Sequence, residues 1–286
     1  MTYALKMMDP IERLVEVLSS MIQMQVNIER FTRLCSTQPR VLDRPDVLEK
    51  YGDSFHPKKE NWEPLYGDIE FRDVSFSYLK VKDNLKHISF KIRPGESLGI
   101  LGATGSGKTT VMSLLLHFYD IDSGAIYLNG KDIRNIEPSV LRRQFGLVMQ
   151  NDFLFSDTIA ENIRFGREVS DDSMEDAIDS AQASEFINQL EERTEHELTT
   201  NGTNVSGGQR QRILLSRAFA SNPEFLLLDD SSSALDYATD AKLRRALTEK
   251  YPDTTMVIIA QRVSSIRSCD QIMILDNGDL SDIGRD

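Results

Sequence analysis

The sequence is poor in cysteine, in long apolar runs and in basic clusters. Its two cysteines, Cys35 and Cys269, are far apart and follow no metal-binding or CxxC spacing. This excludes a disulfide framework and favours free thiols in a reducing compartment. The longest uncharged run near the start, residues 17–28, is interrupted by polar side chains and is too short to span a bilayer. No secretory signal precedes it. These absences predict a soluble, cytosolic chain.

The charge balance is acidic. The chain of 286 residues has 33 Lys and Arg against 45 Asp and Glu, for a net charge of −12. Because phosphate backbones demand clustered Lys and Arg, this balance counts against nucleic acid as a partner. The share of hydrophobic residues, 40 %, is that of an ordinary globular protein. The length allows one large or two small domains.

The first part of the chain predicts an amphipathic helix over residues 10–38. Asp9 and Pro10 form a typical helix start, apolar residues then recur at helical spacing, and Pro39 ends the pattern. A helix of this length is expected to dock on something outside the chain, and packing on its own domain is the plainer alternative. Residues 39–66 contain five prolines or glycines and predict a linker.

From residue 67 onward the pattern predicts an α/β domain. Residues 69–78 alternate as a half-buried strand does, a second strand follows at 88–92, and a third at 97–101 leads into a glycine-rich loop and an apolar helix. Further apolar runs predict buried strands of a mostly parallel sheet, at 225–228, 256–259 and 272–275. Between residues 152 and 205 we expect an inserted helical subdomain, in which Ser170 caps a helix over 171–181.

The glycine-rich loop fits G-x-x-x-x-G-K-[ST] at every fixed position, between a strand and a helix as this motif requires. Its glycines let successive N–H groups point at phosphate oxygens, and the following helix adds its positive N-terminus. Lys108 would reach the β- and γ-phosphates, and the Thr109 hydroxyl would bind Mg²⁺. The predicted nucleotide-binding residues are Gly102, Ala103, Thr104, Gly105, Ser106, Gly107, Lys108, Thr109 and Thr110.

A second Mg²⁺ ligand is expected at the end of a neighbouring strand. Asp229 follows four apolar residues, at the carboxyl end where open α/β sheets bind ligands. A helix N-cap is the alternative role for this side chain. The loop and the aspartate together predict a binder of Mg-nucleotide, a class that includes kinases, GTPases and motor ATPases.

Further motifs resemble the nucleotide-binding domain of ATP-binding cassette (ABC) transporters over residues 67–282. Residues 204–209, Asn-Val-Ser-Gly-Gly-Gln, resemble that family's signature loop, with Val205 where Leu is usual. Gln150 is similar to the glutamine of the Q-loop, Asp236 to the D-loop aspartate, and Tyr78 to the aromatic residue that stacks on adenine. The resemblance implies a P-loop NTPase core, with antiparallel strands at the N-terminal side of a mostly parallel sheet. It assigns ATP and Mg²⁺ as cofactors, and it gives Gln150 both a catalytic and a metal-binding role.

The resemblance also implies partners. In the family, two such domains sandwich two nucleotides head to tail, so that Val205, Ser206, Gly207, Gly208 and Gln209 would contact the partner's ATP. Residues 151–162 resemble the exporter segment that contacts the membrane permease, and helix 10–38 resembles the cytosolic end of an exporter's last membrane helix. Phe153 and Phe155 are candidates for that contact, and a place in the core is the alternative for both. We therefore expect a domain on the cytoplasmic side of a membrane, cut from a longer polypeptide.

Two positions depart from the family's catalytic pattern. Asp230 stands where a glutamate activates the attacking water, and Gln261 stands where a histidine contacts the γ-phosphate. The aspartate is one methylene shorter, and a displacement of about 1 Å can cost roughly 100-fold in rate. Glutamine carries no charge and cannot shuttle a proton. The pair predicts a degenerate, slow ATPase site, similar to one half of a heterodimeric exporter, although a homodimer is possible.

Two alternatives stay open on the sequence alone. One is an ATP-gated dimerisation module with negligible hydrolysis. The other is a soluble, non-transport ABC ATPase that acts on DNA or the ribosome, against which the exporter-like segment and the acidic charge both count. A nucleotide kinase is a further class, but it would not explain why the chain has the signature-like loop.

Overall fold

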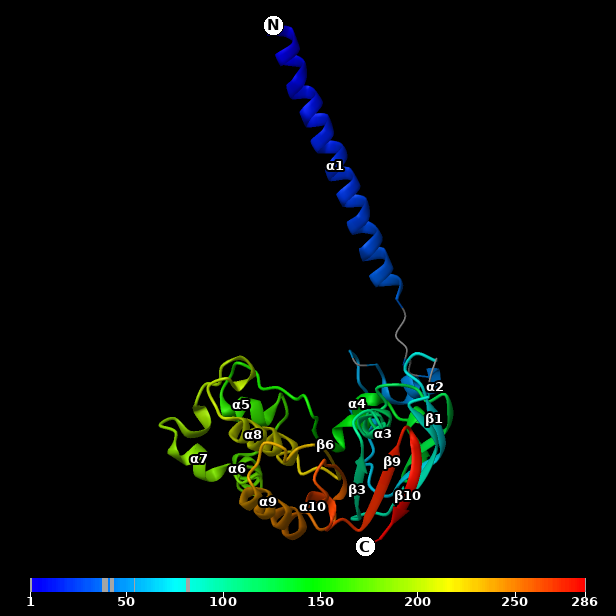
Figure 1. The fold of residues 1–286 in the computed structure, drawn as a ribbon, viewed down its shortest axis with the longest axis vertical. Coiled ribbons are helices and arrows are strands. Elements are labelled where there is room, and N and C mark those ends of the chain that lie inside the picture. The colour runs from blue at the N-terminus through cyan, green and yellow to red at the C-terminus, as the bar shows by residue number, and fades with distance from the viewer. Residues whose placement is uncertain (1, 38–40, 42–43, 54, 81–82, 286) are drawn as a thin grey trace. The chain divides into compact units, whose positions relative to one another are not determined.

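The computed structural model describes residues 2–37, 41, 44–53, 55–80 and 83–285 (Figure 1). Within helix α1, side chains are described for Pro10 and from Arg13 onward. The chain divides into two compact units, residues 1–42 and 43–286.

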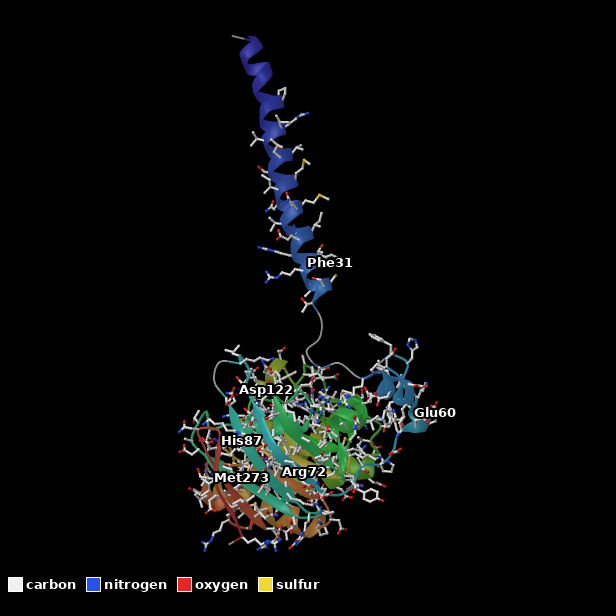
Figure 2. All side chains as sticks on the ribbon, turned by 90° about the vertical axis from the view of Figure 1, so that its right-hand side faces the viewer. Phe31, Glu60, Arg72, His87, Asp122 and Met273 are labelled. Carbon is white, nitrogen blue, oxygen red and sulfur yellow. The ribbon has the colours of Figure 1, made fainter. Side chains whose placement is uncertain are left out.

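The first unit is helix α1, Thr2–Ser36. It begins eight residues before the predicted start, so Pro10 lies inside it. A proline inside a helix removes one N–H from the hydrogen-bond ladder and crowds the carbonyl four residues earlier, yet here the helix continues on both sides of it. Gln38, the predicted last residue, lies outside the described residues. Large apolar side chains along α1 are exposed, Phe31 among them at 67 % (Figure 2). None of the described helices is both long enough and apolar enough to cross a membrane.

The second unit is built on one sheet of ten strands in the order β5-β4-β1-β2-β10-β9-β3-β8-β7-β6. Strands β3, β6, β7, β8 and β9 run parallel to their neighbours in this group, whereas β1, β2, β4 and β5 pair antiparallel. Strand β10 joins the two parts, antiparallel to β9 and parallel to β2. This confirms the predicted P-loop type of α/β core.

The strand bounds match the apolar runs where the runs are short and buried. The strands are β1 Ile69–Phe76, β2 Leu85–Ile92, β3 Ser97–Gly102, β4 Ser123–Leu128, β5 Lys131–Asp132, β6 Phe145–Val148, β7 Phe225–Asp229, β8 Thr255–Ile259, β9 Gln271–Asp276 and β10 Asp279–Gly284. Every residue of β7 is buried, as its unbroken apolar run predicts.

Helices cover the sheet and form the subdomain. They are α2 Pro45–Tyr51, α3 Lys108–Leu115, α4 Pro138–Arg143, α5 Ile159–Arg164, α6 Asp171–Ser180, α7 Ser184–Gln189, α8 Gly207–Phe219, α9 Tyr237–Lys250 and α10 Val263–Ile266. Short 3₁₀ turns lie at Lys59–Asn61, Ile133–Asn135, Arg193–Glu195 and Thr200–Gly202. Helices α5, α6 and α7 gather away from the antiparallel strands (Figure 1). The hydroxyl of Ser170 accepts from the N–H of Ser173, so Ser170 caps α6 as predicted.

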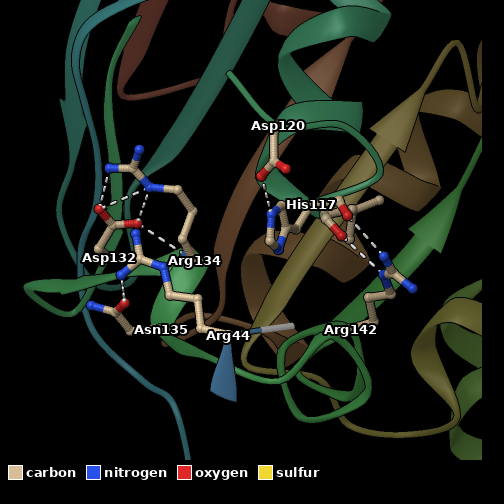
Figure 3. Close-up of polar contacts among 8 residues, drawn as sticks. Arg44, His117, Asp120, Asp132, Arg134, Asn135 and Arg142 are labelled. Carbon is tan, nitrogen blue, oxygen red and sulfur yellow. Dashed lines mark hydrogen bonds and ion pairs between the residues drawn. The ribbon is translucent and has the colours of Figure 1, made fainter. Parts of the chain in front are cut away.

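The prediction of a linker over residues 39–66 is wrong from Pro45 onward, where the chain is folded onto the second unit. Pro45 begins helix α2, since proline fits the first turn of a helix. Val47, Tyr51 and Leu65 are buried in the main core. Arg44 donates to Asn135 Oδ1 at 2.7 Å, which ties the segment to the 3₁₀ turn before α4 (Figure 3). Residues 39, 40, 42, 43 and 54 lie outside the described residues.

Candidate nucleotide site

The predicted phosphate loop and the two strand-end acids line one cleft. Its volume is about 440 Å³. It is lined by Tyr78, Asn84, Gly102, Ala103, Thr104, Gly105, Gly107, Lys108, Thr109, Thr110, Gln150, Asp229, Asp230, Ile259 and Gln261. Residues from five separate stretches of the chain therefore meet at the carboxyl ends of β3, β7 and β8, where an open α/β sheet binds its ligand.

The phosphate loop keeps its shape through glycine. Gly107 has φ of 103°, and a Cβ there would lie 2.7 Å from Leu85 Cδ2 and 2.8 Å from the carbonyl oxygen of Asn84. Gly105 has φ of 82°, and no atom lies within 4 Å of where its Cβ would be. A side chain at Gly105 would fill the open space in which a phosphate is expected. Ser106, the one loop residue that does not line the cleft, is buried and its hydroxyl has no hydrogen-bond partner.

Lys108 and Thr109 begin α3 directly after this loop. The Lys108 ammonium donates to the carbonyl oxygens of Gly102 and Ala103, each at 2.8 Å. The Thr109 hydroxyl donates to Asp229 Oδ2 at 2.6 Å. Burial raises the pKa of the Asp229 carboxyl, and the bond from Thr109 partly offsets this rise.

The donor set fits Mg²⁺. The Thr109 hydroxyl, the Asp229 carboxylate and the Gln150 amide all line the cleft and supply oxygen, which this hard cation prefers. A divalent cation would also offset the cost of keeping the Asp229 carboxylate ionised in a buried position.

The two residues that depart from the family pattern contact each other. The Gln261 side-chain amide donates to Asp230 Oδ2 at 3.0 Å. Asp230 has φ of 53°, a left-handed conformation that is unusual outside glycine. Its N–H donates to the carbonyl of Ile259 at 2.8 Å. Burial raises the pKa of the Asp230 carboxyl, and the hydrogen bonds from Gln261 oppose this shift.

Tyr78 also lines the cleft. Its ring makes edge contacts with Phe76 and Tyr119, with centroid distances of 4.8 and 5.0 Å. Its hydroxyl lies 3.3 Å from Thr110 Oγ1. The sequence reasoning missed Asn84 and Ile259 among the cleft residues. Asn84 accepts from the N–H of Tyr78 at 3.1 Å, and no motif marks it because its position depends on the pairing of β1 with β2.

The helix after the phosphate loop is held at its far end. The apolar run after the loop predicts a helix over residues 109–118, but the helix ends at Leu115, because His117 takes a left-handed φ of 51°. The Arg142 guanidinium donates to the carbonyls of Leu116 and His117 at 2.9 and 2.8 Å (Figure 3). His117 Nε2 lies 2.8 Å from Asp120 Oδ1. Donors at this end satisfy carbonyls that the helix itself leaves free.

The signature-like loop lies outside the cleft, at the start of α8. Ser206 and Gln209 form a complete capping box, in which the Ser206 hydroxyl accepts from the N–H of Gln209 and the Gln209 side chain accepts from the N–H of Ser206. Val205 is half-buried against the helical subdomain. Asp236, the D-loop aspartate, caps α9 by accepting from the N–H groups of Ala238 and Thr239. These hydrogen bonds hold the pKa of Asp236 below its usual value.

A phosphate loop between β3 and α3, with two acids at the end of the parallel strand β7, defines a P-loop nucleotide-binding protein. Strand β8 lies between β3 and β7, so the strand that carries Asp229 is not the direct neighbour of β3 that the sequence suggested. The family model for ABC transporters matches residues 85–233. The chain therefore belongs to the ABC transporter family, and it has the fold of that family's nucleotide-binding domain.

Its relatives include exporters. The chain is 35 % identical over 286 residues to a putative multidrug export ATP-binding/permease protein of Bacillus subtilis, covering 99 % of this chain and 47 % of the relative. It is 42 % identical over 221 residues to an ATP-dependent lipid A-core flippase of Vibrio parahaemolyticus, covering 76 % and 38 %. The solved structure of a bacterial Atm1-family ABC exporter with ATP bound matches with a TM-score of 0.81 at 31 % identity, covering 92 % and 44 %. The chain thus spans less than half the length of each.

Proposed function

We propose that this chain is the ATPase domain of an ABC exporter on the cytoplasmic side of a membrane, and that its own site is degenerate. It would dimerise head to tail with a second such domain around Mg-ATP, with each signature-like loop facing the partner's nucleotide. The observation that carries the proposal is the single cleft that brings the phosphate loop together with Asp229, Asp230, Gln150 and Gln261.

The roles follow from chemistry and position. Lys108 and the loop amides would hold the phosphates, and Tyr78 would stack on the base. Thr109, Asp229 and Gln150 would hold Mg²⁺, which neutralises the developing phosphate charge. Asp230 would orient the attacking water. Gln261 already donates to the Asp230 carboxylate and offers no group that takes up a proton, so we expect turnover to be slow.

A surface on the helical subdomain supports a permease as the second partner. Phe153, Phe155 and Phe165 are exposed at 49, 45 and 49 % and contact one another in sequence, with centroid distances of 5.0 and 5.5 Å. A hollow of about 300 Å³ lies beside Phe155 and Phe165. The two predicted contact residues are therefore on the surface, where a coupling segment of a permease could pack. The exposed apolar side chains of α1 are consistent with the same partner.

The test of this function is nucleotide binding by a lysine variant. We expect Lys108→Ala to weaken the binding of Mg-ATP by about 10- to 100-fold, because hydrogen bonds to charged groups contribute roughly 1.5–3 kcal/mol each. The titration uses a fluorescent ATP analogue, with Lys131→Ala as a control because Lys131 pairs with Glu63 away from the cleft. Equal affinity of the Lys108 variant and the wild type would overturn the assignment of the site.

A second prediction concerns stability. We expect Asp229→Asn to raise the melting temperature without nucleotide. The pKa of the Asp229 carboxyl is raised in the folded chain, so its ionisation costs more in the folded state than in the unfolded one. The fold therefore loses stability as the pH rises through the folded-state pKa, and an asparagine avoids this loss. A relief of about 1 kcal/mol would correspond to roughly 2–4 °C. The gain should disappear below the usual pKa of an aspartate, where both states carry the proton. Thermal melts at pH 7 and pH 3.5 check this, and a fall in melting temperature at pH 7 would contradict it.

A further inference from the structure

One glutamine of α8 bonds to two points of the chain directly after β7, Asp230 and Ala234. The side-chain amide of Gln211 donates to the carbonyl oxygen of Asp230 at 3.0 Å. The Gln211 side-chain oxygen accepts from the N–H of Ala234 at 2.9 Å. A single half-buried side chain on α8 therefore bonds both to Asp230 and to the D-loop segment, residues 231–236.

The same segment packs directly under the signature-like loop. A Cβ at Gly208 would lie 3.1 Å from the carbonyl oxygen of Ala234, and one at Gly207 would lie 3.8 Å from Ala234 Cβ. On its other side the segment meets the residues after β8, where Arg262 donates to the carbonyl of Ser233 at 3.5 Å. Residues 230–236 therefore lie between the side of the cleft that holds Gln261 and the start of α8.

The bond from Gln211 fixes the backbone of Asp230. With a φ of 53°, Asp230 holds a left-handed conformation that is unfavourable for a residue other than glycine. Its N–H is held by Ile259 and its carbonyl by Gln211, so both flanking peptide groups are anchored. The direction of the Asp230 carboxylate depends on these two backbone anchors and on the bond that Oδ2 accepts from Gln261.

We propose that Gln211 is a positioning residue that sets the Asp230 carboxylate and links this chain's own ATP cleft to its signature-like loop. The second half of the proposal rests on the proposed function, in which that loop serves the partner's nucleotide. A shift of Asp230 when Mg-ATP binds would reach α8 through one side chain.

The experiment measures hydrogen exchange in the whole chain with and without Mg-ATP. In the wild type, Mg-ATP should slow exchange at residues 207–212 as well as in the phosphate loop. Gln211→Met keeps the size and helix preference of the side chain but removes both bonds. We expect about tenfold faster exchange at the Ala234 amide, loss of the response at 207–212, and affinity for Mg-ATP within about twofold of the wild type.

A second variant separates the two bonds. Gln211→Glu keeps an acceptor for the Ala234 N–H but cannot donate to the Asp230 carbonyl. It should leave exchange at Ala234 near the wild-type rate and still lose the response at 207–212. The control is Gln144→Met, which removes one bond from a half-buried glutamine, to the carbonyl of Val140, and should behave as the wild type.

The outcomes distinguish this proposal from the function on which it rests. A wild-type chain with no response at 207–212, or a Gln211→Met variant that keeps the response, would overturn the link. Unchanged exchange at Ala234 in Gln211→Met would overturn the bond itself. Failure of the wild type to bind Mg-ATP would instead count against the proposed function, and the Ala234 amide would still report on Gln211.

Discussion

Asp230→Glu combined with Gln261→His should raise steady-state ATP turnover by about 100-fold over the wild type. The longer side chain moves the carboxylate outward, and misplacement of a positioning group by about 1 Å can cost 100-fold. The histidine restores a side chain that can accept and donate a proton, which contributes roughly 10²–10⁴-fold in general acid–base catalysis. Turnover is measured at saturating Mg-ATP over a series of protein concentrations, because a head-to-tail dimer gains activity faster than linearly.

The structure makes the two changes interdependent. Gln261 donates to Asp230 Oδ2 at 3.0 Å, so replacing either residue alone leaves the other without its present partner. We expect each single variant to gain much less than the double variant, as residues in contact are not additive. Adding Lys108→Ala to the double variant should abolish the gain. If the double variant binds Mg-ATP yet hydrolyses it no faster than the wild type, the chain is better described as an ATP-gated binding module.

Local sequence motifs predicted which residues line the cleft better than they predicted the hydrogen bonds between those residues. The phosphate loop is contiguous, so its residues can be recognised without knowing the fold. Asp229 and Ile259 are register partners on β7 and β8, which places the residues after these strands side by side. A sequence predicts that both strands end at one edge, but not that Gln261 bonds to Asp230 or that Gln211 reaches Asp230 from α8. Those contacts depend on tertiary packing.

The errors near the N-terminus have a similar cause. Proline suggested a helix start at residue 10 and a linker after residue 39, yet Pro10 lies inside α1 and Pro45 begins α2. In the segment predicted as a linker, the buried residues are too widely spaced to show the periodicity of a helix or a strand. The prediction also omitted the hairpin of β4 and β5, although Asn129 and Gly130, with φ of 49° and 70°, form the kind of turn that joins such strands.

Arg217→Met should destabilise the second unit by about 3 kcal/mol. Arg217 lies on α8, two turns after the signature-like loop, and is only 5 % exposed. It donates to the carbonyls of Asn162 and Phe153 at 2.8 and 3.0 Å and to Asn162 Oδ1 at 3.0 Å. Burial lowers the pKa of its guanidinium, and the nearby Asp152 carboxylate opposes this shift. Methionine would fill the space but leave the carbonyls of Asn162 and Phe153 without these donors, each at a cost of about 1–3 kcal/mol before local relaxation, while Asn162 Oδ1 keeps the N–H of Phe155.

The same side chain holds the surface proposed for the permease. The Arg217 guanidinium lies 4.6 Å from the centre of the Phe165 ring, so it supports the exposed aromatic cluster from below. We therefore expect exchange at residues 153–162 to rise in Arg217→Met while the affinity of the cleft for Mg-ATP stays the same. Urea denaturation measures the stability, and Arg210→Ala is the control, since Arg210 makes one long bond, 3.3 Å, to the carbonyl of Asn201. A loss below about 1 kcal/mol, within the range of ordinary substitutions, would show that this segment is held by its own hydrogen bonds and not by α8.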